Sequence, residues 1–457
     1  MVTGLNSSHT TDTRRTHVRY LIVLMLFAAS AFSYGDRFAL SIAGLPMARD
    51  LGLDALHLGY LFSGFSWAYV VGQLPAGGLL DSFGSKRVYG ISIIGWSICA
   101  ALVGFAGFLY ASLAFYTIFA LRLLSGLVQS PVFPGNGRIV AAWFPTAERG
   151  TASAIFNSSQ YFALVLFAPI IGWIAHAHGW KDCFWFLGAL GLVVGFVWFR
   201  VVYDVKAHPS ISQEEIDHIA QGGGLVSVDR TQGKSNALTR SIIKRLLSSR
   251  MLVGIYIGQY CINTLTWFFL TWFPVYLNQA RHMSLMTVGF VAVLPALCGC
   301  VGGVLGGVVS DGLLRAGYSL TFARKAPIVT GMLLAMAMIA CNYTHAQWLI
   351  VFWMALAFLG KGFGALGWTV ISDTSPKGMV GVNGGLFNLI GNLAGVTTPI
   401  VIGYIVKRTG SFNDALLFVG LTALMAIVAY LPIVGTIQRV EFPTGTESGI
   451  VAERTDA

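Results

Sequence analysis

Four ionisable residues lie inside long apolar stretches of this sequence, where such side chains are rare. They are the adjacent Asp36 and Arg37, followed by Arg122 and Lys361. A charged group in an apolar setting is costly, so it needs a partner or a task. Two guanidinium groups and an ammonium group can bind an organic anion, and a carboxylate can carry a proton. These residue types therefore predict anion binding coupled to proton transfer.

The adjacent pair has two interpretations. On a helix Asp36 and Arg37 point about 100° apart, so they are not side-by-side partners. The functional interpretation assigns Arg37 to a substrate carboxylate and Asp36 to a proton. An apolar setting favours the protonated acid and a neighbouring arginine favours the ionised one, so anion binding could couple the two. The alternative is a structural ion pair with another helix.

The other two cations have further possible roles. The planar guanidinium group of Arg122 can bind both oxygens of a carboxylate at once. Gln129 lies two helical turns further along the same face. The alternative for Arg122 is a structural cation between helices. Lys361 has glycine on both sides, which predicts a loosened helix that exposes its backbone to a cavity. A third cation suits a substrate with two carboxylates, whereas simple snorkelling fits a central lysine poorly.

Neutral polar residues in the apolar stretches suit a ligand with several hydroxyl groups. Asn388 and Asn392 lie one helical turn apart and share a face. Each residue could instead join two helices by a hydrogen bond. The candidates are Tyr34, Tyr69, Gln160, Tyr256, Tyr260, Asn263, Trp368, Ser372, Asn388 and Asn392.

The elements that position these residues are predicted to be transmembrane helices. Of 457 residues, 55% are hydrophobic and 11% are charged, against roughly 25% charged in soluble domains. The apolar runs are long enough to cross a bilayer, and the first carries Asp36 and Arg37, which argues against a signal peptide. We expect an all-α integral membrane protein with twelve spans at 20–43, 57–79, 88–108, 112–137, 151–175, 183–203, 252–277, 286–309, 326–343, 347–371, 381–405 and 413–436.

The distribution of lysine and arginine predicts the orientation. Beyond the three cations within spans, one set of loops holds only Arg49, Lys181, Arg281, Lys407 and Arg408, and the opposite set holds the remaining 21. Positive residues collect on the cytoplasmic side, so both termini are expected in the cytoplasm, with the chain in the inner membrane. The net charge of +10 is thus a topology signal and indicates no nucleic-acid partner.

The two halves of the chain repeat one another at a constant offset. Gly77-Gly-Leu-Leu-Asp81 returns as Gly307-Val-Val-Ser-Asp311, and Phe156-Asn157 returns as Phe387-Asn388. Duplicated halves with a site between them are the architecture of alternating-access carriers. The predicted organisation is a tail at 1–19, a six-helix half at 20–203, a cytoplasmic and partly helical linker at 204–251, a second half at 252–436 and a disordered tail at 437–457.

Several motifs resemble the major facilitator superfamily. The stretch from Gly77 to Arg87 is similar to its loop 2–3 signature, and the segments around Asp36 and Arg122 resemble its anion:cation symporter branch. Three further segments look most like bacterial glucarate/galactarate permeases: 134–145, 258–263 and 364–368.

The resemblance implies roles for individual residues. Tyr34, Tyr69, Gln160, Ser372 and the asparagines at 388 and 392 match positions that line the pocket of this branch. Much of the branch has a proton-linked glutamate at the position of Gln129, which cannot titrate, so Asp36 is left as the main proton candidate. Asp81 with Arg87, and Asp311 with Arg315 or Arg324, are expected to form cytoplasmic latches of the outward-open state, with ordinary solvation as the alternative.

Other function classes fit the sequence less well. It has no phosphate-binding loop of the kind an ATP-driven pump needs, and one deep aspartate does not make an intramembrane enzyme. A transporter-like sensor would carry a long signalling domain. We expect a monomeric secondary transporter that needs no cofactor besides the coupling proton and imports glucarate or galactarate. The alternatives are an exchanger without proton coupling and a carrier of a monocarboxylate such as galactonate.

Overall fold

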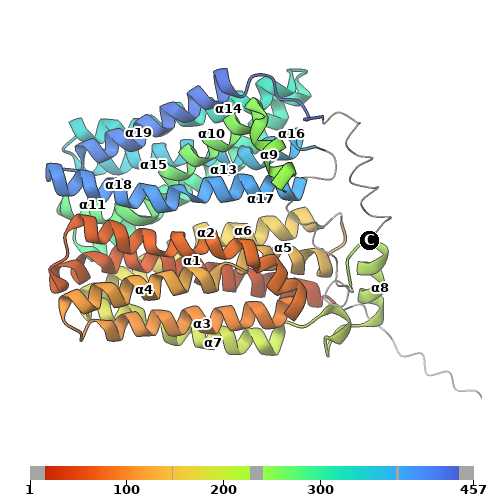
Figure 1. The fold of residues 1–457 in the computed structure, drawn as a ribbon, viewed down its shortest axis with the longest axis horizontal. Helices are drawn as coiled ribbons and strands as arrows, with labels where there is room; N and C mark the ends of the chain where they lie inside the picture. Colours follow the sequence, from red (N-terminus) through yellow and green to blue (C-terminus); the bar gives the residue numbers. More distant parts are fainter. Residues whose placement is uncertain (1–15, 147, 227–239, 377–379, 442–457) are drawn as a thin grey trace, which may run out of the picture.

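The computed structural model describes residues 16–146, 148–226, 240–376 and 380–441, and the helices of this part form two groups. Helices α1 to α7 make one half and α10 to α19 make the other (Figure 1). Most of the predicted tails, and the expected disorder of the carboxyl-terminal one, lie outside the described residues. The all-α fold class is confirmed.

Six helical spans build the first half. They agree with the predicted spans, although most are longer at one or both ends. Their helices are α1 (Val18–Leu51), α2 (Ala55–Phe83), α3 (Ser85–Ala106), α4 (Ala111–Gln129) with α5 (Val132–Trp143), α6 (Arg149–Ala177) and α7 (Trp180–Val201). The fourth span is interrupted at Ser130 and Pro131, which lie between α4 and α5, and Pro131 has no backbone N–H to continue the helix.

Six further spans build the second half, and several contain irregular turns. Their helices are α10 (Arg250–Trp267) with α11 (Phe273–Gln279), α12 (Leu285–Val291) with α13 (Val293–Arg315), α14 (Leu320–Ala335), α15 (Gln347–Phe363) with α16 (Gly367–Thr374), α17 (Val380–Asn392) with α18 (Ala394–Thr409), and α19 (Asn413–Val428). Five-residue π-helical turns occur at Phe268–Trp272 and Ala429–Ile433, and 3-10 turns at Met336–Tyr343 and Gly364–Leu366. Within the described residues, ten spans are long and apolar enough to cross a membrane by length and composition.

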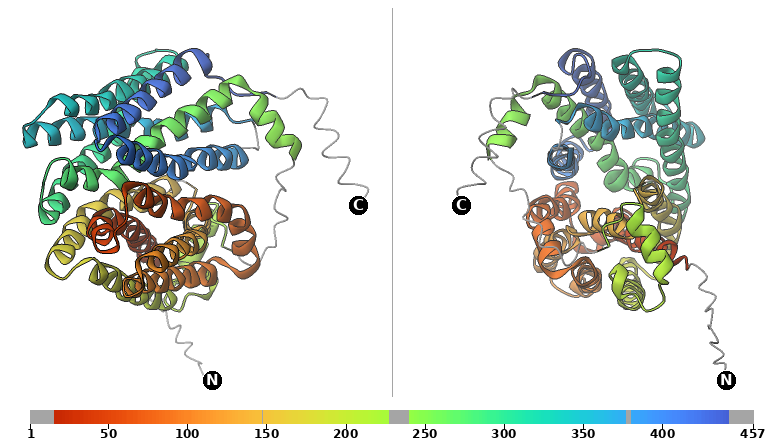
Figure 2. Two further views of the ribbon diagram at one scale, coloured as in Figure 1. Left: turned by 60° about the vertical axis from the view of Figure 1, so that its left-hand side comes forward. Right: turned by 90° about the vertical axis from the view of Figure 1, so that its right-hand side faces the viewer.

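The connection between the halves defines one end of the molecule, which we call the linker end. It contains a 3-10 turn (Val205–Ala207), α8 (Gln213–Gln221) and α9 (Arg240–Ser248). In the end-on view of Figure 2, α8 lies against the first half and α9 against the second. The buried Glu215 accepts hydrogen bonds from the backbone N–H groups of Val18 and Arg19. A carboxylate at the start of α1 satisfies otherwise unpaired donors and complements the helix dipole.

The halves meet closely at the opposite end, which we call the far end. Helix α2 packs along α18, and α12 packs along α6. A Cβ atom added at Gly59 would lie 2.6 Å from the carbonyl oxygen of Pro399, and one added at Gly403 would lie 2.6 Å from that of Ala55. Only glycine allows this separation, so these positions bring the two backbones together at the far end.

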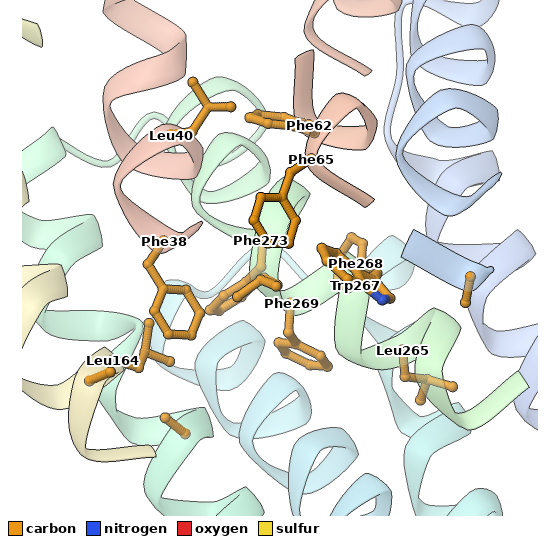
Figure 3. Packing of buried hydrophobic residues seen from close by; sticks show 14 of the residues in the cluster. Phe38, Leu40, Phe62, Phe65, Leu164, Leu265, Trp267, Phe268, Phe269 and Phe273 are labelled. Atoms are coloured by element: carbon orange, nitrogen blue, oxygen red, sulfur yellow. The ribbon is translucent and has the colours of Figure 1, made fainter. Parts of the chain in front are cut away.

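An apolar layer fills the space beneath these contacts (Figure 3). The rings of Phe62 on α2 and Trp272 in the π-helical turn lie 5.4 Å apart, edge to face, and so join the two halves. Phe38 of α1 and Phe269 of the same turn are also buried within it. The far side of the interface is therefore closed by packed rings.

Polar contacts across the halves reinforce this closure. The Lys407 ammonium lies 2.9 Å from the Asp54 carboxylate, and Arg49 donates to Asn278 at 3.3 Å. Partial burial raises the pKa of Asp54, but hydrogen bonds from the His57 backbone and from Lys407 outweigh it and lower the pKa to about 2. The carboxylate is therefore ionised throughout the physiological range.

We predict that Lys407→Gln shifts the molecule towards states open at the far end. An exposed ion pair contributes about 0.2–1 kcal/mol, so the open fraction should rise by up to about fivefold. Since the pKa of Asp54 is depressed, this contribution is present above the usual carboxylate range and is lost only as the pH falls towards 2. Distances between spin labels on α2 and α18 measure the shift, with Lys407→Arg as the control. Equal distance distributions in Lys407→Gln and the parent protein would contradict it.

Candidate functional site

A buried ionic network lies within the first half. An Arg122 nitrogen lies 3.5 Å from the Asp36 carboxylate, and the Gln129 amide donates to the same carboxylate at 3.1 Å. All three side chains are almost completely buried. The structure thus places the cation of the fourth span beside the acid of the first, as the ion-pair interpretation of Asp36 proposed. This geometry leaves the predicted proton role of Asp36 untested.

Gln129 connects this pair to the neighbouring arginine. Its side-chain oxygen accepts a hydrogen bond from Ser33 at 2.9 Å and one from the Nε of Arg37 at 3.4 Å. The amide therefore donates to a carboxylate and accepts from a guanidinium group, and a carboxylate at this position could do only the second. The glutamine is suited to joining Asp36 and Arg37 without adding a charge.

Aromatic rings surround the Arg37 guanidinium group. Its central carbon lies 4.5 Å from the centroid of Phe65, 4.9 Å from that of Tyr69 and 5.2 Å from that of Tyr34. Ring faces attract a cation and pack against its flat surface. The structure therefore brings Tyr34 and Tyr69, both predicted as site residues, next to the predicted anion-binding arginine.

The network leaves buried donors unused. The Nη2 of Arg37 and the Nε of Arg122 are buried and have no hydrogen-bond partner among the described residues. Buried guanidinium N–H groups are strongly favoured to have acceptors. In the described part of the first half, Asp36 is the only carboxylate buried with these two cations. One carboxylate balances one of the two positive charges, so the cluster can accept a further anion.

A small cavity of about 50 Å³ lies between the two halves. Three predicted site residues line it: Tyr34 of α1, Gln160 of α6 and Lys361 of α15. Phe38 and Phe269 form part of its wall, and they belong to the apolar layer at the far end. The cavity is therefore lined by residues of both halves, including the charged Lys361.

The glycines beside Lys361 have a different effect from the expected one. Helix α15 is regular through Lys361, and a 3-10 turn begins only at Gly364. A Cβ atom added at Gly360 would lie 2.2 Å from the Gly331 carbonyl oxygen, and one at Gly362 would lie 2.4 Å from that of Gly299. The prediction of a loosened helix was wrong, because these glycines allow close packing against α14 and α13.

Comparisons with known proteins identify the family. Residues 26–399 match the Major Facilitator Superfamily. The chain is 57% identical over 428 residues to a probable galactarate/D-glucarate transporter of Bacillus subtilis (strain 168), covering 93% of this chain and 94% of that one. It is 54% identical over 443 residues to a probable galactarate/D-glucarate transporter of Escherichia coli (strain K12), covering 96% and 98%.

The chain belongs to the major facilitator superfamily. Its function is therefore transport across a membrane. A solved bacterial homologue of the human lysosomal transporter Spinster, in an inward-facing and occupied conformation, is similar in fold. The TM-score is 0.71 at 14% identity, over 91% of this chain and 96% of that one.

The second half of this superfamily member contributes amides to the region between the halves. Gln259 donates to Asn263 at 3.3 Å, and Asn392 donates to the side-chain oxygen of Asn388 at 3.0 Å. Asn388 in turn donates across the halves to Gln73 at 3.5 Å. Three predicted site residues are thus held in amide pairs, one of which reaches the first half.

Four predicted residues lie outside these groups, and one of them, the buried Tyr256, donates to Asn383. The Tyr260 hydroxyl is 2.6 Å from that of Thr397, in an exposed position. Trp368 packs edge to face on Phe387 and is 48% exposed. Ser372 is exposed and donates to the backbone of its own helix. In this conformation they do not contact the charged network or line the cavity.

The predicted latch residues have partners within their own halves. Asp81 pairs with Arg138 of α5 and not with Arg87, which is exposed. In this conformation α5 brings Arg138 to the end of α2, and the pairing with Arg87 expected in the outward-open state stays a prediction. Asp81, Arg87 and Arg138 all belong to the first half.

The matching pair in the second half uses the second of its two expected partners. Arg324 lies 3.4 Å from Asp311 and 2.9 Å from Asp373, whereas Arg315 is exposed. Neither Asp81 nor Asp311 therefore joins the two halves in this conformation. Their role in gating stays a prediction.

Sequence reasoning missed several residues of the site. Tyr161 and Thr266 line the cavity, and Gln73 and Gln259 belong to the amide pairs. Tyr161 follows Gln160, and Gln259 precedes Tyr260, so each was adjacent to a selected residue. A search for all polar residues in the spans would have found them, but only the packing shows which face the other half.

We predict that Asp36→Asn destabilises the protein by about 3–5 kcal/mol, because it leaves a buried cation without its carboxylate. The double variant Asp36→Asn/Arg122→Gln should recover part of this loss, since it removes both charges. Unfolding of the purified protein in detergent measures both effects. If the losses of the two single variants simply added in the double variant, the two residues would not be coupled in the way the geometry indicates.

Proposed function

We propose that the chain imports galactarate or D-glucarate together with protons by alternating access. Two relatives named as probable galactarate/D-glucarate transporters align with nearly all of the chain and support this proposal. The observation that carries the proposal is the pair of unused donors on Arg37 and Arg122, buried beside a single carboxylate. Such donors fit the carboxylate of a sugar acid.

The network suggests how anion binding and proton binding are coupled. In the proposed mechanism, Arg122 and the Gln129 amide stabilise the ionised form of Asp36 while no substrate is bound. A substrate carboxylate that binds the two guanidinium groups competes with Asp36 for their positive charge. When Asp36 is no longer paired with a guanidinium group, its buried carboxyl group is more stable with a proton bound. Substrate and proton therefore bind together, as symport requires.

The proposed orientation follows from the positive residues. We assign the linker end to the cytoplasm, with both termini there and the chain in the inner membrane, because most of the lysines and arginines in the described part of the chain lie at that end. The far end then faces outwards. Close packing of the halves at the far end corresponds to an inward-facing state. The proposed transporter acts as a single chain, and its only coupling agent is the proton.

An exchanger of organic anions is the second candidate. Asp36 already has two partners, and Gln129 cannot titrate, so the cluster could cycle between anions without taking up a proton. In that mechanism an anion is always needed to balance the cations. A monocarboxylate such as galactonate is the alternative substrate, and it would use only the guanidinium cluster.

Uptake into proteoliposomes tests the proposal. Galactarate and D-glucarate should accumulate in response to an inward proton gradient in the parent protein. Asp36→Asn should abolish this accumulation while anion exchange continues, because the binding cations remain and the proton acceptor is lost. Retained exchange is the control for folding. Uptake that ignores the gradient and depends on internal anion would identify an exchanger and remove the proton role from Asp36.

A further inference from the structure

The direction of Lys361 is fixed by the residues on either side of it. Gly360 packs against α14 and Gly362 against α13, with backbone separations that leave no room for a side chain. Successive residues of a helix are 100° apart, so residue 361 faces away from the side shared by these two contacts. The remaining direction is the cavity that Lys361 lines with Tyr34 and Gln160. Helix packing therefore holds the lysine towards the first half.

The Lys361 ammonium group has no anionic partner in this position. No ion pair or hydrogen bond of its side chain occurs among the described residues, and its closest recorded interaction is with the Phe358 ring, 5.2 Å from the centroid. By contrast, the Nζ of Lys325, in the same half, donates to the Leu431 carbonyl oxygen at 3.3 Å. A lysine inside a span without an anionic partner is costly, which points to an anion that binds during the transport cycle.

The cavity has the size and position of one end of an extended anion. At about 50 Å³ it accommodates a small group such as a carboxylate, and it is too small for a whole sugar acid. Tyr34 lines this cavity and also packs on Arg37, with 5.2 Å between the guanidinium carbon and the ring centroid. The tyrosine thus stands between a cation of the first half and a cation of the second.

We propose that Lys361 binds the second carboxylate of a dicarboxylate substrate while the Arg37–Arg122 cluster binds the first, so that the lysine selects dianions over monocarboxylate sugar acids. This assignment rests on the function proposed above. A monocarboxylate would satisfy the guanidinium cluster but leave Lys361 unpaired. Because the lysine is already unpaired in the free protein, the charge-assisted contact that only a dianion gains is the source of the selectivity.

Binding and uptake of a matched pair of acids test the assignment. Galactarate and galactonate differ in one terminal carboxylate. We expect Lys361→Gln to weaken galactarate binding by about 10- to 100-fold, the range of a charge-assisted hydrogen bond, and to change galactonate binding by less than about threefold. Lys361→Arg should retain most of the preference, because it keeps the charge. Calorimetric titration of the purified protein measures affinity, and proteoliposome uptake measures transport.

Lys325→Gln is the matched control, since it removes a buried lysine of the same half that lies outside the cavity. It should leave the ratio of the two affinities unchanged. Equal weakening of both acids in Lys361→Gln would show a structural role and overturn the assignment, as would an unchanged preference for galactarate. If the parent protein neither binds nor transports galactarate, the proposed function itself fails. A parent that transports it and a variant that keeps its preference would reject only the role of Lys361.

Discussion

The constraint on which the site depends is the placement of charge in an apolar interior. Asp36, Arg37 and Arg122 are all buried, where a charge without a nearby opposite charge is costly. The Asp36–Arg122 pair compensates one cation, and Gln129 joins the pair to the other arginine by hydrogen bonds. One positive charge is left over. That surplus gives the site its affinity for an anion, and it would be absent if residue 129 were an ionised glutamate.

The helices around the network are arranged to keep it rigid. Gly126, one turn before the end of α4, has its Cα so close to α2 that an added Cβ atom would lie 2.0 Å from the Phe65 carbonyl oxygen. This contact sets the separation of the helices that carry Arg122 and the Phe65 ring beneath Arg37. Within the membrane, small residues fix the distances between helices by close packing, as large residues do in the core of a soluble protein.

The sequence predicted the spans and the charged residues well because both depend on strong local signals. A run of apolar residues identifies a helix in lipid, and Asp36 or Lys361 is conspicuous within one. Pairing is a property of packing and was harder to infer. The partner of Asp81 in this conformation is Arg138, which α5 supplies and which lies far from Asp81 in the sequence. The glycines beside Lys361 predicted a loosened helix, because sequence alone does not distinguish a flexible glycine from one pressed against another backbone.

Alternating access requires that some contacts persist while others break. The Asp36–Arg122–Gln129–Arg37 network lies wholly in the first half, and the Arg324 pairs lie wholly in the second. Movement of the halves as rigid bodies leaves both intact. The contacts that must change are those between halves: the ring pair Phe62–Trp272, the ion pair Asp54–Lys407 and the cavity shared by Tyr34 and Lys361. A ligand held at that cavity by cations of both halves would therefore sense their separation directly, and its binding energy could drive the change of state.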